Sequence, residues 1–125
     1  MKYALITGSN GLVGSEAVEF FIKKKFKIIA IDNNFRSYFF GKNADTTWQK
    51  KIQIKKFKKD VFHYNIDIRN QKKINNIFFK YRKNIKCIIH AAAQPSHDWA
   101  YKEPILDFDI NARSTLYMLE STKRY

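Results

Sequence analysis

A short stretch near the N-terminus restricts the fold of this 125-residue chain more than any other feature. The apolar run Tyr3–Thr7 leads directly into GSNGLVG at residues 8–14, which holds three of the chain's four glycines. A helical pattern follows, in which Val13, Ala17, Phe20 and Phe21 share one face. A strand, a glycine loop and a helix in this order predict the first unit of a parallel sheet with helical crossovers.

The remaining sequence repeats this alternation of strands and helices. Further strands are predicted at residues 27–31, 61–65 and 85–90, each a short run rich in apolar residues. The chain is therefore predicted to be one α/β domain over residues 1–125, a Rossmann-type, doubly wound parallel sheet that stops after the fourth strand and the helix behind it.

The helices between these strands are less evenly marked. Asn70 is a suitable N-cap for a helix, and a last helix is expected from Pro104 onward. Residues 33–60 are expected to be an irregular insertion with a short helix near 46–51, and residues 94–102 to be a loop. The buried face of the helix after Asn70 is predicted to hold Ile74, Ile77, Phe78 and Tyr81.

The composition gives the chain a net charge of +13, from 24 basic and 11 acidic residues. Lysine dominates the basic residues and accompanies many Asn, Ile, Phe and Tyr, which all have AT-rich codons, so genome composition accounts for the charge. The densest basic run, residues 50–59, lacks the arginines typical of specific nucleic-acid recognition. A solvated charged face is favoured there over a nucleic-acid site.

Other sequence signals indicate a cytoplasmic protein. No window approaches the roughly 18 uninterrupted apolar residues of a membrane span, and the start lacks the apolar region of a signal peptide. Cys87 is the single cysteine and cannot form an internal disulfide. Like His63, it is expected to lie in the core. No His, Cys, Asp or Glu cluster has the spacing of metal ligands.

The glycine loop has the chemistry of a phosphate site. Gly8 allows the tight turn, Gly11 lets the backbone approach a pyrophosphate, and Gly14 permits close packing of the helix on the strand. The helix N-terminus adds unpaired N–H groups and a partial positive charge. Asn10 and Leu12 lie in the same loop and are included in the predicted site. The alternative is a glycine turn with a structural role only.

An acidic residue at the end of the second strand strengthens the nucleotide interpretation. Asp32 can accept hydrogen bonds from a ribose 2′-hydroxyl and would repel a 2′-phosphate, which favours NAD over NADP as the cofactor. Asn33 follows it in the predicted site. Arg36 is close enough in sequence to complicate the preference for NAD, and a plain turn residue is the alternative for Asp32.

Several motifs resemble those of one family. Thr7-Gly8-x-x-Gly11-x-x-Gly14, Asp67-Ile68-Arg69, His90-Ala91-Ala92-Ala93 and the segment starting Asn111-Ala112-Arg113 resemble the extended short-chain dehydrogenases/reductases, the NAD-dependent sugar-nucleotide epimerases and dehydratases. Phe39-Phe40-Gly41, Trp48 and the run from Ala91 to Ala100 resemble the branch that contains CDP-paratose 2-epimerase. The resemblance covers essentially the whole chain.

The resemblance implies roles for individual positions. Asp67 and Ile68 would flank the adenine, and Asn111 would brace the central helix, which in such enzymes commonly contributes to a dimer interface. Ser96 and His97 would lie near a nucleotide-sugar substrate, with a CDP-hexose suspected. The nicotinamide end of NAD would be lined by Ala91, Ala92, Ala93 and Gln94.

The resemblance also implies that the catalytic residues lie elsewhere. In this family a Tyr-x-x-x-Lys pair and a Ser or Thr follow the fifth strand, which lies beyond these residues. The one such pair present, Tyr38 and Lys42, contains Gly41 and is not expected to be catalytic. We therefore expect an NAD-binding N-terminal part of an epimerase, inactive alone. The alternatives are a non-catalytic nucleotide-sensing module and another epimerase or dehydratase.

Overall fold

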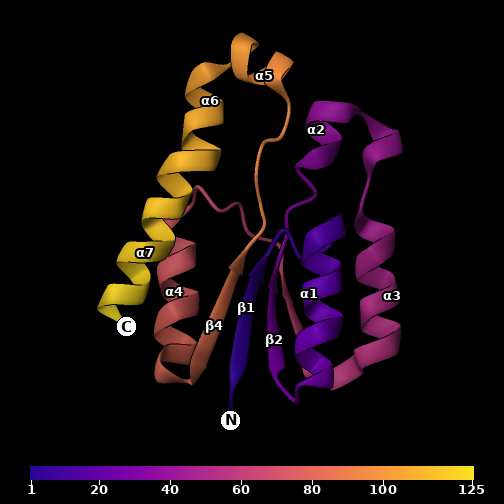
Figure 1. Cartoon of the computed structure of the whole chain (residues 1–125), viewed down its shortest axis with the longest axis vertical. Helices are drawn as coiled ribbons and strands as arrows, with labels where there is room; N and C mark the ends of the chain where they lie inside the picture. Colours follow the sequence, from indigo (N-terminus) through magenta and orange to yellow (C-terminus); the bar gives the residue numbers. More distant parts are fainter.

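A four-stranded parallel sheet forms the centre of the computed structural model, which describes residues 1–125 (Figure 1). Its strands are β1 (Tyr3–Thr7), β2 (Lys27–Ile31), β3 (Val61–Tyr64) and β4 (Ile85–His90), in the spatial order β3-β2-β1-β4. The last residue of β1 is in register with the last residues of both its neighbours, Ile31 and His90. The carboxyl ends of the strands therefore meet at one edge, which confirms the predicted fold class.

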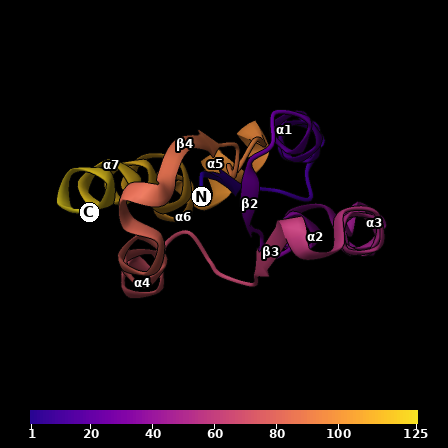
Figure 2. The ribbon, with the colours of Figure 1, turned by 90° about the horizontal axis from the view of Figure 1, so that it is seen from below.

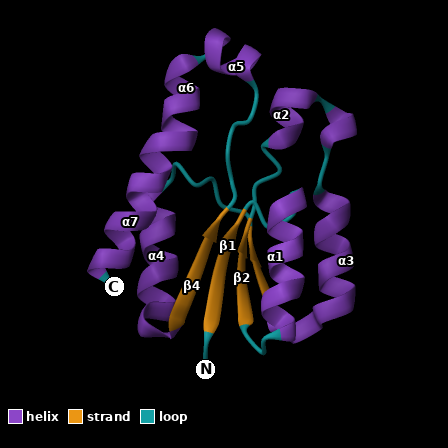
Figure 3. Ribbon diagram, in the orientation of Figure 1, coloured by secondary structure: helices purple, strands orange, loops and turns teal.

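Helices cover both faces of this sheet, giving three layers (Figures 2 and 3). One face is covered by α1 (Leu12–Lys23) and α3 (Thr47–Phe57). An ion pair between Glu19 and Lys56 joins these two helices. The other face is covered by α4 (Gln71–Tyr81) and α7 (Ser114–Arg124). Above the carboxyl edge lie α2 (Arg36–Phe40), α5 (His97–Lys102) and α6 (Pro104–Phe108), and a π-helical turn at Asp109–Arg113 continues α6 into α7.

Alternating side chains of the strands build a separate apolar core on each face. Leu5 and Ile29 point towards α4 and α7, whereas Ala4 and Ile6 point towards α1. The four residues predicted for the buried face of α4 are all buried, and the Asn70 side chain accepts a hydrogen bond from the Lys73 backbone N–H as an N-cap. The central strands β1 and β2 are therefore buried between the two layers of helices, and residues 4–7 and 28–31 are at most 1% exposed.

The buried face of α1 agrees with the predicted one only in part: Ala17 and Phe21 pack against the core, whereas Val13 and Phe20 do not. Val13 and Phe20 are 64% and 54% exposed, and Gly14 and Val18 are the buried residues of this helix. The helix is turned so that Gly14 contacts the loop after β1, and the face that packs on the sheet follows from that contact. A pattern of apolar side chains could not reveal it, because the residue at its centre has no side chain.

The connections are more helical than predicted. The segment 33–60 contains α2 and a longer α3, and α5 occupies part of the expected loop at 94–102. The third strand ends at Tyr64, one residue earlier than predicted. His63 and Cys87 are half-buried, so neither belongs to the core. None of the helices combines the length and apolar character needed to cross a membrane.

Candidate functional site

The loop between β1 and α1 brings three backbone segments into close contact. Gly8 has φ +64°, and a Cβ there would lie 2.8 Å from the Ala92 backbone nitrogen. A Cβ on Gly14 would overlap the Gly8 carbonyl oxygen and lie 2.9 Å from the Ser9 Cα. Both positions therefore require glycine: Gly8 because of its positive φ and its contacts, and Gly14 because of its contacts alone.

The N-terminus of α1 presents unpaired backbone donors at this loop. The Gly11 N–H donates to the Gly8 carbonyl and the Ser15 N–H to the Gly11 carbonyl, both at 2.9 Å. The N–H groups of Leu12, Val13 and Gly14, which come between them, have no acceptor within the chain. Three adjacent free donors at the positive end of a helix form a binding site for a phosphate anion.

Asp32 lies beside the same loop with its carboxylate already oriented. Its Oδ2 accepts a hydrogen bond from the Asn10 backbone N–H at 2.9 Å, and its Oδ1 accepts one from the Asn34 backbone N–H at 2.8 Å. A carboxylate oxygen can accept two hydrogen bonds, so each still has capacity for a hydroxyl donor. The arrangement suits recognition of a ribose.

A cavity of about 310 Å³ connects these groups at the carboxyl edge of the sheet. Its floor is the glycine loop and its walls come from the segments that follow β2, β3 and β4. The predicted site residues that line it are Gly8, Gly11, Leu12, Gly14, Asp32, Asn33, Arg36, Asp67, Ile68, Ala91, Ala92 and Ala93. Residues separated by more than 80 positions in the sequence therefore share one cavity.

Three of the other predicted residues support the walls of this cavity without lining it. The backbone N–H of Asn10 holds Asp32, as described above. The Asn111 side chain accepts from the Gln94 backbone N–H at 2.8 Å and donates to the Gln94 carbonyl at 2.9 Å. The buried Gln94 side chain donates to the Ser96 carbonyl and to Asp107, both at 2.8 Å. The loop after β4 is thereby fixed to the turn before α7.

The two residues predicted to meet substrate lie outside the cavity. The Ser96 hydroxyl accepts a hydrogen bond from the Trp99 backbone N–H at 3.3 Å and so caps α5. His97 is the first residue of α5 and is exposed. His90, at the end of β4, lies 2.8 Å from the Thr7 hydroxyl, and burial lowers the pKa of its imidazole.

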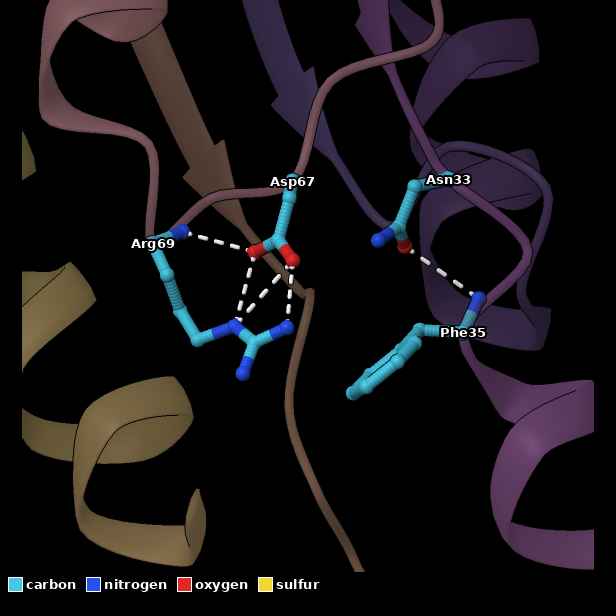
Figure 4. A network of polar contacts seen from close by, with 4 residues as sticks. All are labelled: Asn33, Phe35, Asp67 and Arg69. Atoms are coloured by element: carbon cyan, nitrogen blue, oxygen red, sulfur yellow. Dashed lines mark hydrogen bonds and ion pairs between the residues drawn. The ribbon is translucent and has the colours of Figure 1, made fainter. Parts of the chain in front are cut away.

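Asp67 is paired with a residue two positions along the chain (Figure 4). Its carboxylate accepts from the Arg69 backbone N–H at 2.9 Å and from two guanidinium nitrogens, Nε at 3.0 Å and Nη2 at 2.6 Å. Partial burial alone would raise the pKa of the Asp67 carboxyl, but the hydrogen bonds and charge of Arg69 outweigh it and hold the pKa below its ordinary value. The Arg69 guanidinium lies 4.9 Å from the centre of the Phe35 ring.

This pair predicts a pH-dependent contribution to stability. Because folding lowers the pKa of Asp67, its contribution is present above the unfolded pKa of about 3.9 and is lost as the pH falls through the folded pKa. We expect Asp67→Asn to lower the free energy of unfolding by about 1 kcal/mol at pH 7, and the difference from the parent chain to shrink below pH 4. Urea unfolding between pH 7 and pH 3 measures this difference. The control is Asp98→Asn, because Asp98 is exposed and forms no ion pair. A difference that stays constant with pH would contradict the assignment.

A cluster of aromatic residues beside the cavity was not predicted from the sequence. The Trp99 Nε1–H donates to the Phe39 carbonyl at 2.9 Å, and the Trp99 and Phe39 rings are 5.4 Å apart. Phe35 and Tyr38 stack at 4.9 Å. These contacts connect α2 to α5 across the carboxyl edge, and Phe35 and Phe39 line the cavity. The sequence shows that residues 35–40 are rich in aromatic side chains, but it does not show that Trp99 packs against them.

The structure also separates the two residues of the Tyr38-x-x-x-Lys42 pair. Helix α2 ends at Phe40, and Gly41 follows it with φ +79°, so Tyr38 and Lys42 do not share one helix face. The Tyr38 hydroxyl lies 3.4 Å from the nearer carboxylate oxygen of Glu103, and neither residue of the pair lines the cavity. The Lys42 ammonium is therefore not held beside the Tyr38 phenol as a helical Tyr-x-x-x-Lys pair would hold it.

Comparison with known proteins places this site in a family. The profile of the GDP-mannose 4,6 dehydratase family matches residues 5–125. UDP-glucuronate 4-epimerase of Thermodesulfobacterium geofontis is 30% identical over 125 residues, which are 100% of this chain and 36% of that protein. CDP-paratose 2-epimerase of Salmonella typhi is 29% identical over 121 residues, or 97% of this chain and 32% of that protein.

A solved structure shows the same fold. The UDP-glucose 4-epimerase from Bifidobacterium longum, determined in complex with NAD⁺ and UDP, superposes with a TM-score of 0.78 at 24% identity, over 98% of this chain and 34% of that one. The chain thus spans about a third of the length of these two epimerases and of this structure. On the match of the family profile to residues 5–125, it belongs to the NAD-dependent epimerase/dehydratase family of the short-chain dehydrogenases/reductases.

Proposed function

We propose that residues 1–125 form the NAD-binding domain of a sugar-nucleotide epimerase. The observation that carries the proposal is the combination of three free N–H donors at the start of α1 with the oriented Asp32 carboxylate in one cavity. The donors would hold the pyrophosphate of NAD, and Asp32 would accept hydrogen bonds from the adenosine ribose. The Bifidobacterium relative, which shares the fold, contains NAD⁺.

Each further part of the cavity has a role in this proposal. Asp67 and Ile68 would flank the adenine, and the loop from Ala91 to Ala93 would line the nicotinamide end. Bound there, NAD would supply the hydride acceptor and donor for oxidation of a sugar hydroxyl and reduction of the resulting ketone. In this proposal the chain's own residues would bind and orient the cofactor, and the catalytic base would lie outside residues 1–125.

The finer assignment is a CDP-paratose 2-epimerase-like activity on a CDP-hexose, in a homodimeric parent enzyme. The 29% identity to CDP-paratose 2-epimerase supports the substrate class no more strongly than the 30% identity to UDP-glucuronate 4-epimerase supports its own. Exposed apolar side chains on α6 and α7, among them Ile105 at 77% and Leu119 at 62%, support a protein partner at these helices.

Calorimetric titration with NAD tests the cofactor assignment. We expect saturable binding of one NAD per chain, weaker binding of NADP because Asp32 repels a 2′-phosphate, and competition by ADP-ribose. The absence of saturable binding at millimolar NAD would overturn the proposal. A steep fall of binding to nucleic acid with salt, without competition by NAD, would favour a nucleic-acid protein instead.

The catalytic assignment is tested by reading the DNA downstream of codon 125. A strand ending in Ser or Thr followed by Tyr-x-x-x-Lys would support the epimerase. A stop codon with no such motif in any frame would leave an NAD-binding module without catalysis.

A further inference from the structure

Helix α3 has one buried side chain, and that side chain is polar. Gln53 is 2% exposed, and no other residue of α3 is buried. Its Nε2 donates to the Ser9 carbonyl oxygen at 2.8 Å, which joins α3 to the glycine loop. Its Oε1 is buried without a hydrogen-bond partner. Since an unpaired buried acceptor lowers stability, a leucine or methionine would serve packing better at this position.

The hydrogen bond from Gln53 acts on one particular peptide group. The Ser9 carbonyl belongs to the peptide that joins Ser9 to Asn10, and the N–H of that peptide donates to Asp32 Oδ2 at 2.9 Å. A trans peptide is planar, and its C=O and N–H point in opposite directions. The peptide is therefore held from both sides, and rotating it would break both hydrogen bonds.

The orientation of this peptide sets the orientation of Asp32. With Oδ2 bound to the Asn10 N–H and Oδ1 to the Asn34 N–H, the carboxylate has a fixed plane, and its remaining lone pairs are available to a ligand. If the peptide turned over, the Ser9 carbonyl would face the carboxylate and repel it. The Gln53 hydrogen bond to the Ser9 carbonyl would be lost in that orientation, and Gln53 itself does not line the cavity.

We propose that Gln53 is a positioning residue for cofactor binding, which acts through the Ser9–Asn10 peptide to orient Asp32 towards the adenosine ribose. The inference rests on the proposed function for the role of Asp32. It assigns to α3, the main helix of the connection between β2 and β3, a part in recognition of the ribose. The unpaired Oε1 of Gln53 lowers stability, while its Nε2 helps to fix the orientation of the Asp32 carboxylate.

Replacement of Gln53 by methionine separates the two effects. Methionine keeps the length of the side chain and removes the donor, so we expect the dissociation constant for NAD to rise about tenfold. The urea midpoint should stay near that of the parent chain, because removal of the unpaired Oε1 offsets the loss of the donor to the buried Ser9 carbonyl. The matched control is Gln49→Met, one turn earlier on α3, whose side chain makes no hydrogen bond; it should change neither quantity.

A double-mutant cycle tests the route through Asp32. In an Asp32→Ala background, Gln53→Met should change NAD affinity by less than about twofold, because the group that it positions is gone. An undiminished tenfold effect in that background would show that Gln53 acts on the loop by another route, and would overturn the inference.

Amide hydrogen exchange tests the same contact without ligand. The Asn10 amide should exchange about tenfold faster in Gln53→Met, while the Lys73 amide, bound by the Asn70 cap, stays unchanged.

A parent chain that does not bind NAD overturns the proposed function and with it the ribose role. Parent binding with equal affinity in Gln53→Met overturns this inference alone. Unfolding of both Gln53→Met and Gln53→Leu would assign the residue to stability and also overturn it.

Discussion

Replacement of Gly14 by alanine is expected to lower the free energy of unfolding by more than about 3 kcal/mol. The added methyl group would overlap the Gly8 carbonyl oxygen and lie 2.6 Å from the Gly8 carbonyl carbon, and both belong to the backbone of a tight turn. A flexible side chain could move aside at such a contact, but this backbone can move only if α1 shifts away from β1. That shift would open the apolar core around Val18.

Urea unfolding followed by circular dichroism measures this loss. Ser15→Ala, the next position of α1, is the control, because it changes the same helix without placing atoms against the loop. Its midpoint should stay near that of the parent chain. A Gly14→Ala chain as stable as the parent would show that α1 can move away from the loop at little cost, and that the predicted close packing is not required.

Replacement of Asp32 by alanine is expected to weaken NAD binding by about 10- to 100-fold. The change removes the acceptor for ribose hydroxyls and also leaves the N–H groups of Asn10 and Asn34 without their carboxylate. It removes the charge that repels a 2′-phosphate, so the ratio of NAD to NADP affinity should fall as well. Calorimetric titration with both dinucleotides measures the two effects.

Glu120→Ala provides the control for charge. Glu120 is an exposed carboxylate on α7 without an ion pair, so its loss changes the net charge by the same amount but touches no part of the cavity. NAD affinity should be unaffected. If both variants weakened binding equally, the effect of Asp32 would be a general electrostatic one rather than a contact with the ribose.

The sheet was largely predictable because each strand is a short apolar run with polar or glycine residues at its ends. The predicted strand at 85–90 agrees with β4 at both ends. The helices α2 and α5 were missed because their stability comes from contacts with each other, such as the Trp99 hydrogen bond to Phe39, and not from local patterns. Tertiary contacts of this kind leave no periodicity in a short segment.

The site was predictable where backbone geometry demands a residue type. The backbone contacts at Gly8 and Gly14 leave no room for a Cβ, as the motif predicts. Asp32 directly follows β2 and lies beside the glycine loop, and its contact with a ribose stays a prediction. Gln53 was not predictable, since a glutamine among lysines on a polar helix gives no sign of burial. Asn111 was predicted to brace the central helix, and the sequence did not indicate its paired hydrogen bonds to the Gln94 backbone in the loop after β4.

The position of β1 between β2 and β4 affects how the cavity forms during folding. The Thr7 hydroxyl meets His90 across 83 residues of sequence, and it also accepts the Ala92 N–H that completes the cavity wall. During synthesis β1 can pair with β2 early, but its other edge stays open until β4 emerges from the ribosome. The glycine loop therefore gains its final contacts late, so dinucleotide binding would mark the completion of folding rather than its start.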